Sequence, residues 1–256
     1  MIRAILWDVD GTLAETERDG HRVAFNLAFE SMGLPWRWDE AHYGALLRIT
    51  GGRERLLHDM ARRSDAPVLA DERIELSREL HRRKTARYAA LMREQPTPLR
   101  DGVRELIESA RAEGVRMAIA TTTSRANVVA LLSHHFGAQW TQVFETVVCG
   151  EDVRHKKPDP EVYRRCLSAL ALEPNEAVAI EDSPGGVAAA QAAGVPVVVT
   201  RSEYFADAPI DSAVAIGPGL HTRDGWRPAP ALGLGGIGME DLRHWCMQME
   251  SVSHLP

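Results

Sequence analysis

The sequence is poor in cysteine and has no long apolar run. Its three cysteines, Cys149, Cys166 and Cys246, are widely spaced and form neither a CxxC nor a metal-ligand pattern, which argues against a disulfide framework and a zinc site. We therefore expect free thiols in a reducing cytosol. No apolar run approaches the length of a membrane span, and the first expected strand begins at about Ile2, which leaves no room for a signal or transit peptide. These absences predict a cytoplasmic protein with no membrane partner.

An excess of positive charge is also missing. The formal net charge is −6 over 256 residues, and the basic residues stand mostly among acidic ones. Nucleic-acid binding would need a basic face with interleaved aromatic residues, so we predict no nucleic-acid partner. A phosphorylated small molecule would have to be attracted by a local group of residues. The length suits one large domain or a core with a smaller inserted domain, and we expect a monomer.

Residues 17–92 show helical periodicity and contain no convincing strand. Apolar residues such as Val23 and Leu27 recur every three or four positions, and Gly33 ends this first run. The charge-rich stretch from 78 to 87 is typical of a solvated helix face. Further helices are expected at about residues 39–47, 53–62 and 71–92.

From Pro96 onward, expected strands and helices alternate. Asp101 is expected to cap the first of these helices. Nearly all-apolar strands that are separated by helices predict a parallel sheet covered on both faces. The glycine- and proline-rich stretch 216–238 is expected to be irregular, and 239–249 to form a helix docked on the core. The strands are expected at about residues 115–120, 146–149, 177–180 and 195–200, and the helices at about 101–110, 125–135, 159–170 and 186–193.

These patterns predict an α/β fold with two parts. Residues 1–16 and 93–256 would form a Rossmann-like core with a parallel sheet, and residues 17–92 an inserted α-helical cap domain. Ligands of such sheets bind at the carboxyl ends of the strands. Because the helical insertion directly follows the first strand, we expect it to lie above that edge as a lid.

The first strand delivers two carboxylates into a glycine turn, in the sequence Asp8-Val9-Asp10-Gly11-Thr12. Residues two apart on a strand point the same way, so the pleat should aim Asp8 and Asp10 together. Two like charges side by side are costly without a cation or a shared proton, which disfavours a purely structural role. We interpret Asp8 as a metal-bound nucleophile that accepts a phosphoryl group, and Asp10 as a general acid and base.

Polar residues also follow the later strands. Taken singly, Ser124 could be a helix N-cap, Lys157 a loop lysine before a proline, and Glu181 part of a polar turn. Their shared position at strand ends favours one site, because hydroxyls and a lysine suit a phosphate and added carboxylates suit Mg²⁺. The runs are Thr121-Thr122-Thr123-Ser124, Lys156-Lys157-Pro158 and Glu181-Asp182-Ser183.

Over nearly its whole length the chain resembles the haloacid dehalogenase superfamily of phosphotransferases with an aspartate nucleophile. The four motifs of that family match Asp8 to Thr12, Thr121, Lys157-Pro158 and Glu181-Asp182. The second aspartate is present in the phosphatase and phosphomutase branches and absent from the dehalogenase and phosphonatase branches.

This resemblance implies a Mg²⁺ ion held by Asp8, the backbone carbonyl of Asp10 and Asp182, with Glu181 at or near the ion. Asp8 would attack phosphorus in line, and Asp10 would protonate the departing sugar oxygen and then activate water. Thr121 and Lys157 would stabilise the charge on the equatorial oxygens.

Two stretches of the insertion bear on the substrate. Glu15 to Arg22 lies at the hinge, and Thr50-Gly51-Gly52-Arg53 is a glycine turn that opens a helix. Such a turn exposes backbone N–H groups, and with Arg53 it suits a second phosphate. The alternative is a plain helix start with a solvated arginine.

These stretches resemble the CbbY-type xylulose-1,5-bisphosphate phosphatases, which clear an inhibitor of the carbon-fixing enzyme rubisco. The resemblance implies that Glu17 and His21 contact sugar hydroxyls or the cap-side phosphate. Two further runs would bind substrate, namely Thr50, Gly51, Gly52 and Arg53, and Thr122, Thr123 and Ser124.

The chain departs from that family in two places. Trp7 replaces the commoner phenylalanine, which we interpret as a packing change. The tail is longer and rich in glycine, and Arg201 and Tyr204 at the edge of the site could face substrate or solvent.

Three alternatives remain open. A β-phosphoglucomutase has the same motifs and cap type and differs in the lifetime of the phospho-aspartate. A broad sugar-phosphate or phosphoglycolate phosphatase is the second alternative. A binding module without activity would be expected to lack some of the motif residues, and all of them are present.

Overall fold

The computed structural model describes residues 1–253, and of residues 250–253 only the backbone. The described residues form a parallel sheet of six strands in the order β3-β2-β1-β4-β5-β6. β1 lies between β2 and β4, with Ile5 paired to Met117 and to Val178. The strands are β1 (Ala4–Trp7), β2 (Arg116–Ala120), β3 (Thr146–Val148), β4 (Ala177–Glu181), β5 (Val197–Thr200) and β6 (Ala215–Gly217).

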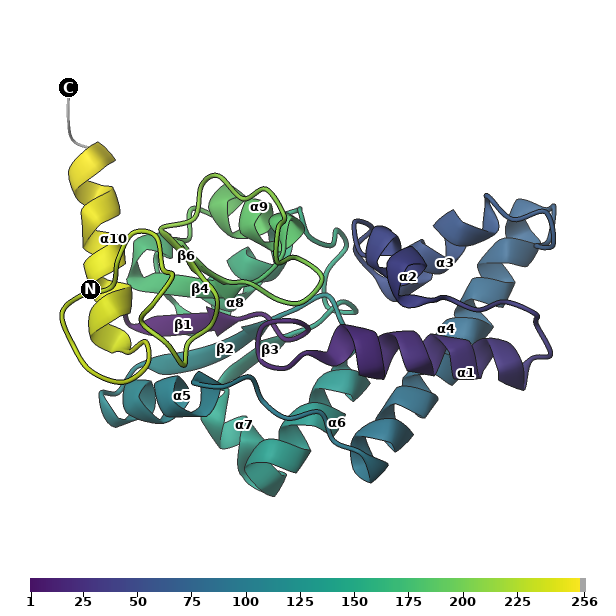
Figure 1. Cartoon of the computed structure of the whole chain (residues 1–256), viewed down its shortest axis with the longest axis horizontal. Coiled ribbons are helices and arrows are strands. Elements are labelled where there is room, and N and C mark those ends of the chain that lie inside the picture. The colour runs from purple at the N-terminus through teal and green to yellow at the C-terminus, as the bar shows by residue number, and fades with distance from the viewer. Residues whose placement is uncertain (254–256) are drawn as a thin grey trace.

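Helices cover both faces of this sheet, as its apolar strands predict. One face of β1, with Ile5 and Trp7, packs against α5 (Val103–Ala112), α6 (Arg125–Phe136), α7 (Trp140–Val143) and α10 (Met239–Ser253). The other face, with Ala4 and Leu6, packs against α8 (Glu161–Leu170) and α9 (Pro184–Ala192). Figure 1 shows α5, α6 and α7 on one side of the sheet and α9 on the other. This layering confirms the predicted α/β class.

The chain between β1 and α5 is helical and forms the cap. It contains a π-helix (Glu17–Arg22), α1 (Val23–Ser31), α2 (Glu40–Leu46), α3 (Gly52–Met60) and α4 (Ala70–Glu94). The cap has its own apolar cluster, built around Phe25, Phe29, Trp38, Tyr43 and Leu80. It lies beside the sheet at the carboxyl end of β1 (Figure 1). The insertion can therefore cover the edge of the sheet where ligands are expected.

Two local predictions differ from the structure. Residues 216–238 were expected to be irregular, and most of them are, but Ile216 and Gly217 belong to β6, which extends the sheet beside β5. Asp101 does not cap α5, because Gly102, with φ of 86°, is the N-cap residue and no side chain caps the helix. β6 was not predicted because its three residues run directly into the glycine- and proline-rich stretch.

Trp7 is a packing residue, as expected from its place in the first strand. Its side chain is fully buried, and its indole N–H lies 3.3 Å from Met117 Sδ. Within residues 1–253, no helix has both the length and the apolar character that a membrane crossing requires.

Candidate active site

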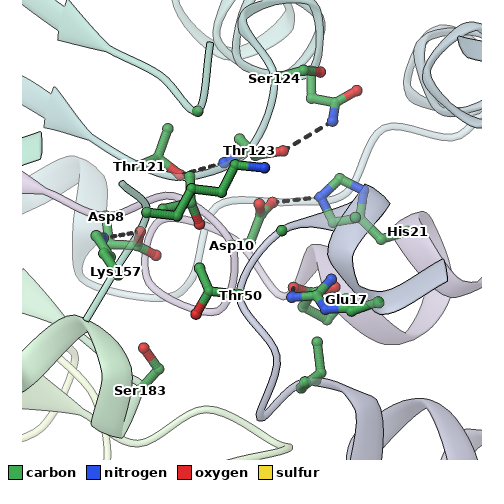
Figure 2. A pocket seen from close by; sticks show the side chains of 18 of the residues that line it. Asp8, Asp10, Glu17, His21, Thr50, Thr121, Thr123, Ser124, Lys157 and Ser183 are labelled. Atoms are coloured by element: carbon green, nitrogen blue, oxygen red, sulfur yellow. Dashed lines mark hydrogen bonds and ion pairs between the residues drawn. The ribbon is translucent and has the colours of Figure 1, made fainter. Parts of the chain in front are cut away.

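A cavity of about 350 Å³ lies between the cap and the carboxyl ends of β1, β2 and β4. It brings together nearly all the residues predicted from the sequence. The core contributes Asp8, Asp10, Thr121, Thr122, Thr123, Ser124, Lys157 and Asp182, and the cap contributes Glu17, His21, Thr50, Gly51, Gly52 and Arg53. Glu181 is fully buried beneath the cavity floor. Figure 2 shows Asp8 and Lys157 on one side, His21 and Glu17 on the other, and Asp10 between them.

Lys157 links two carboxylates on the floor of the cavity. Its Nζ lies 2.7 Å from Asp8 Oδ1 and 2.6 Å from Glu181 Oε1. Burial raises the pKa of Asp8 to about 8, the charge of Lys157 opposes this rise, and the charge of Glu181 adds to it. Burial alone would lower the pKa of Lys157, but the two carboxylates outweigh it and raise that pKa above its usual value. Lys157 therefore keeps a positive charge next to the expected nucleophile.

Glu181 is held by donors from the protein itself. Its Oε1 accepts from Lys157 and, at 2.6 Å, from the Tyr163 hydroxyl, and its Oε2 accepts from Asp182 N and Ser183 Oγ at 3.2 and 3.3 Å. With both oxygens used in this way, Glu181 orients Lys157 and the start of α9. Tyr163 was not predicted from the sequence, where it stands only as one residue of an apolar stripe.

Asp10 has different partners from Asp8. β1 ends at Trp7, so the strand pleat does not set the direction of Asp10. Its Oδ1 accepts from Thr16 Oγ1 at 2.5 Å and lies 2.8 Å from His21 Nε2. Burial would raise the pKa of Asp10, but the contacts with His21 and Thr16 outweigh burial and hold that pKa well below its usual value. The residue expected to act as acid and base is thus held from the cap side (Figure 2).

Lys84 was missed by sequence reasoning. It belongs to the stretch 78–87, which was expected to be a solvated face, yet only 4% of it is exposed. Its Nζ lies 2.8 Å from His21 Nδ1, and burial lowers its pKa to about 8. The prediction was wrong for this residue because every fourth residue of this part of α4 is buried, namely Leu80, Lys84 and Tyr88. That spacing of four was the signal available in the sequence.

Asp8, Glu181 and Asp182 form a cluster that suits a hard cation. Their carboxylate oxygens lie within 4.8 Å of one another. Burial, followed by the charges of Asp8 and Glu181, holds the pKa of Asp182 well above its usual value. Asp182 is oriented by Ser202 Oγ at 2.5 Å and Thr12 Oγ1 at 3.4 Å. Crowded, buried oxygen ligands of this kind fit a divalent metal ion.

The loop after β2 offers hydroxyls to the same cavity. Thr121 Oγ1 accepts from Thr123 N at 3.3 Å, and Thr123 Oγ1 accepts from Asn127 Nδ2 at 2.9 Å. Ser124 is the N-cap residue of α6, but its side chain makes no capping bond and its Oγ has no partner among the described residues. The Ser124 hydroxyl is therefore available to a ligand.

The cap end of the cavity is rich in positive charge. α3 starts at Gly52, and Arg53 Nε is buried without a partner among the described residues. Lys156 also lines this end, and its Nζ lies 2.8 Å from Glu54 Oε1. Burial, with the charges of Lys84 and Lys156, lowers the pKa of His81 to about 4. The surplus of cations suits a second anionic group.

Three other residues have contacts that define their positions. Glu17 accepts from the Tyr43 hydroxyl and lies 3.6 Å from Arg55 Nη2, so cap side chains fix it at the cavity wall. Arg201 Nη1 donates to the carbonyls of Phe205 and Ala208 and is not part of the cavity wall. Tyr204 packs against Tyr43, with ring centroids 6.0 Å apart.

Known proteins are similar to this chain in sequence and in fold. A sequence model of the haloacid dehalogenase-like hydrolases matches residues 2–194. Protein CbbY of Rhodobacter capsulatus is 46% identical over 203 residues, which cover 79% of this chain and 87% of that protein.

Two solved structures resemble the whole arrangement of core and cap. A crystal structure of CbbY from Rhodobacter sphaeroides in complex with phosphate matches with a TM-score of 0.78 and 42% identity, covering 83% of this chain and 92% of that chain. A mutant of the same protein in complex with xylulose-(1,5)bisphosphate matches with the same TM-score, identity and coverage.

Proposed function

Since this chain belongs to the haloacid dehalogenase-like hydrolases and is a phosphoric monoester hydrolase, we propose that it is a Mg²⁺-dependent sugar-phosphate phosphatase whose preferred substrate is xylulose 1,5-bisphosphate. The product would be xylulose 5-phosphate. One observation carries the proposal: a single cavity has a nucleophilic carboxylate and a lysine at one end, and at the other end Lys156 and Arg53, whose buried Nε has no partner among the described residues. The complex of a CbbY relative with xylulose-(1,5)bisphosphate supports this choice of substrate.

The core end of the cavity is suited to phosphoryl transfer. Asp8 would attack phosphorus and form a covalent aspartyl phosphate, which splits the hydrolysis into two easier steps. Lys157 and Thr121 would donate to the equatorial oxygens of the transferring group. Asp8 and Asp182 would hold Mg²⁺, which supplies further positive charge at those oxygens when bound. Glu181 would keep Lys157 pointed at Asp8 through their shared hydrogen bond.

Asp10 would act as the general acid and then as the general base. We assign to its protonated form the transfer of a proton to the departing sugar oxygen in the first step, which leaves Asp10 ionised. In the second step it would take a proton from the water that attacks the aspartyl phosphate. Contacts with His21 and Thr16 favour its ionised form, which suits this second role.

The cap would bind the part of the substrate that lies beyond the transferring phosphate. We propose that residues 17–92 form this substrate-binding cap on a core of residues 1–16 and 93–256. Arg53 and the backbone N–H groups at the start of α3 would bind the second phosphate, because a helix N-terminus with an adjacent arginine favours an anion. Glu17 and His21 line the cavity across from Asp8 (Figure 2), where they would contact sugar hydroxyls.

The proposal is tested by measuring Mg²⁺-dependent phosphate release at matched low concentrations of four substrates. These are xylulose 1,5-bisphosphate, ribulose 1,5-bisphosphate, phosphoglycolate and β-glucose 1-phosphate. A strong preference for the first is expected. Similar rates on all four would indicate a broad phosphatase, and formation of glucose 6-phosphate from the last would indicate a mutase.

Asp8→Asn tests the chemistry separately from the substrate. The amide is a poor nucleophile, so we expect no phosphate release above background. Asp211→Asn changes an exposed aspartate outside the cavity and should behave like the wild type. Full phosphate release by Asp8→Asn would contradict the proposed mechanism.

A further inference from the structure

Arg100 lies in the second of the two connections between core and cap. The two connections run side by side, since Ala14 forms a β-bridge with Leu99 and Arg100 N donates to Leu13 O at 2.8 Å. Arg100 is therefore part of the hinge on which the cap is mounted.

The Arg100 side chain leaves this hinge and enters the core. Its Nη1 donates to the carbonyl of Gly11 and, at 3.1 and 3.2 Å, to Oγ1 and O of Thr200. Its Nη2 donates to the carbonyls of Arg201 at 2.5 Å and Pro218 at 3.3 Å. Only 13% of the side chain is exposed. One guanidinium thus joins the loop after β1, the end of β5 and the segment after β6.

The first two of those segments are the ones that hold Asp182. Thr12 Oγ1 donates to one oxygen of Asp182 and Ser202 Oγ to the other. Gly11 approaches so closely that a Cβ there would lie 2.2 Å from Asp182 Oδ2. Any shift of either segment would therefore move the Asp182 carboxylate.

We propose that Arg100 is a positioning residue that ties the cap hinge to the metal-binding carboxylate Asp182. By joining Gly11 to Thr200 and Arg201, it fixes the separation of the two segments that grip Asp182. The position of the cap hinge and the position of the Asp182 carboxylate then depend on the same hydrogen bonds of Arg100. The identity of the ion rests on the proposed function, whereas the mechanical link rests on the hydrogen bonds of Arg100 alone.

An arginine suits this role better than a lysine. The planar guanidinium offers five donors in a fixed fork, so it can serve several carbonyls at once, whereas a lysine ammonium is a compact charge on a flexible stem. Arg100→Lys keeps the charge and loses the fork, and Arg100→Met loses both.

The test measures metal binding without turnover. Mn²⁺ binding is followed by electron paramagnetic resonance and Mg²⁺ binding by calorimetry, for the full-length wild type, Arg100→Lys, Arg100→Met and the control Arg104→Met. Arg104 lies in α5 and makes no bond to the segments around Asp182. Loss of a residue that orients a metal ligand typically costs about 10- to 100-fold in affinity.

We expect dissociation constants about tenfold higher or more in Arg100→Met, an intermediate value in Arg100→Lys, and no change in Arg104→Met. Substrate KM at saturating metal should change much less than the metal dependence. Wild-type affinity in both Arg100 variants, or an equal loss in Arg104→Met, would overturn the proposal. If Arg100→Met does not fold, as judged by circular dichroism, Arg100→Lys decides. Metal binding and turnover of the wild type test the proposed function independently of these comparisons.

Discussion

At the scale of single residues, a buried lysine in the cap is connected to the expected acid and base of the core. Lys84 contacts His21, and His21 contacts Asp10. Burial lowers the pKa of Lys84, the charges of Asp10 and Glu17 oppose this, and Arg55 adds to it. The cap thereby influences the charge state of Asp10, for which we propose the acid and base role.

The lowered pKa of Lys84 predicts a loss of activity at alkaline pH. Because folding lowers this pKa to about 8, the folded protein loses the proton at a lower pH than the unfolded chain. The stability cost of the buried charge is therefore present below about pH 8 and disappears as the pH rises from 8 towards 10.5. In the folded protein, the positive charge beside His21 is lost as the pH passes about 8. We expect kcat/KM of the wild type to fall as the pH passes 8.

Lys84→Met checks this assignment. It removes the charge at every pH, so its kcat/KM should be at least about tenfold lower at pH 7 and should not fall between pH 7 and 9. Arg87→Met, on the exposed side of the same helix, should keep the wild-type profile. If Lys84→Met still shows the alkaline fall, another group is responsible for it.

The site residues at the strand ends could be predicted from the sequence. Several residues that hold them in place could not. Asp8, Thr121, Lys157 and Asp182 were found because each follows an apolar strand, and a parallel sheet brings such positions together. Arg100 lies far along the chain from the segments it joins, and nothing in its neighbours indicates that contact. Lys84 shares a spacing of four with Leu80 and Tyr88, which marks a buried face of α4, but its contact with His21 is seen only in the folded chain.

At the scale of secondary-structure elements, the first turn of α9 approaches the carboxylate that orients Lys157. Ser183 caps this helix, accepting from Gly186 N at 3.1 Å. A Cβ at Gly186 would lie 2.0 Å from the Glu181 carboxylate, whereas a Cβ at Gly185 would meet only Thr50 Oγ1, at 3.7 Å. The helix can approach Glu181 this closely only with glycine at position 186.

Gly186→Ala is therefore expected to lower activity. The added methyl group would push Glu181 away and with it Lys157, so kcat should fall about 10- to 100-fold. The overpacking would also lower the free energy of unfolding by about 1–3 kcal/mol. Steady-state kinetics and chemical unfolding measure the two effects. Gly185→Ala is the matched control and should change neither by much, so an equal loss in both variants would refute this account.

Strong repeating patterns made most elements predictable, and elements next to turn-rich sequence were harder to predict. Five strands could be predicted from short apolar runs, and the flanking helices from apolar residues that recur every three or four positions. β6 runs directly into the glycine- and proline-rich stretch that starts at Gly217, so its apolar residues did not stand out as a strand. Asp101 looked like a cap because of its residue type, but the backbone places Gly102 at the N-cap with a positive φ.

At the scale of the whole molecule, the cap and core meet through both packing and ion pairs. α4 packs against α6, and the pairs are Arg18 with Glu203 and Glu54 with Lys156. The Glu54 and Lys156 side chains are 45% and 25% exposed, so their attraction is screened by solvent. Lys156 lines the cavity and Glu54 does not, which gives the two partners different expected roles.

This difference predicts unequal effects of removing each partner. Glu54→Gln breaks only the ion pair between cap and core. Because an exposed ion pair is weak, we expect KM to change by at most about fivefold. Lys156→Met also removes a cation from the second-phosphate end of the cavity, so we expect KM for xylulose 1,5-bisphosphate to rise about tenfold or more. Phosphoglycolate, which has one phosphate, should show little change in either variant.

The double variant separates the contact between cap and core from direct recognition of the substrate. With Lys156 gone, Glu54→Gln has no pair left to break, so the double variant should match Lys156→Met in KM, with kcat close to that of the wild type. Steady-state kinetics at low and high ionic strength provide the measurement, and salt should reduce the difference between Lys156→Met and the wild type because it screens the charge. Equal increases in KM for Glu54→Gln and Lys156→Met would show that the pair acts only by holding the cap on the core.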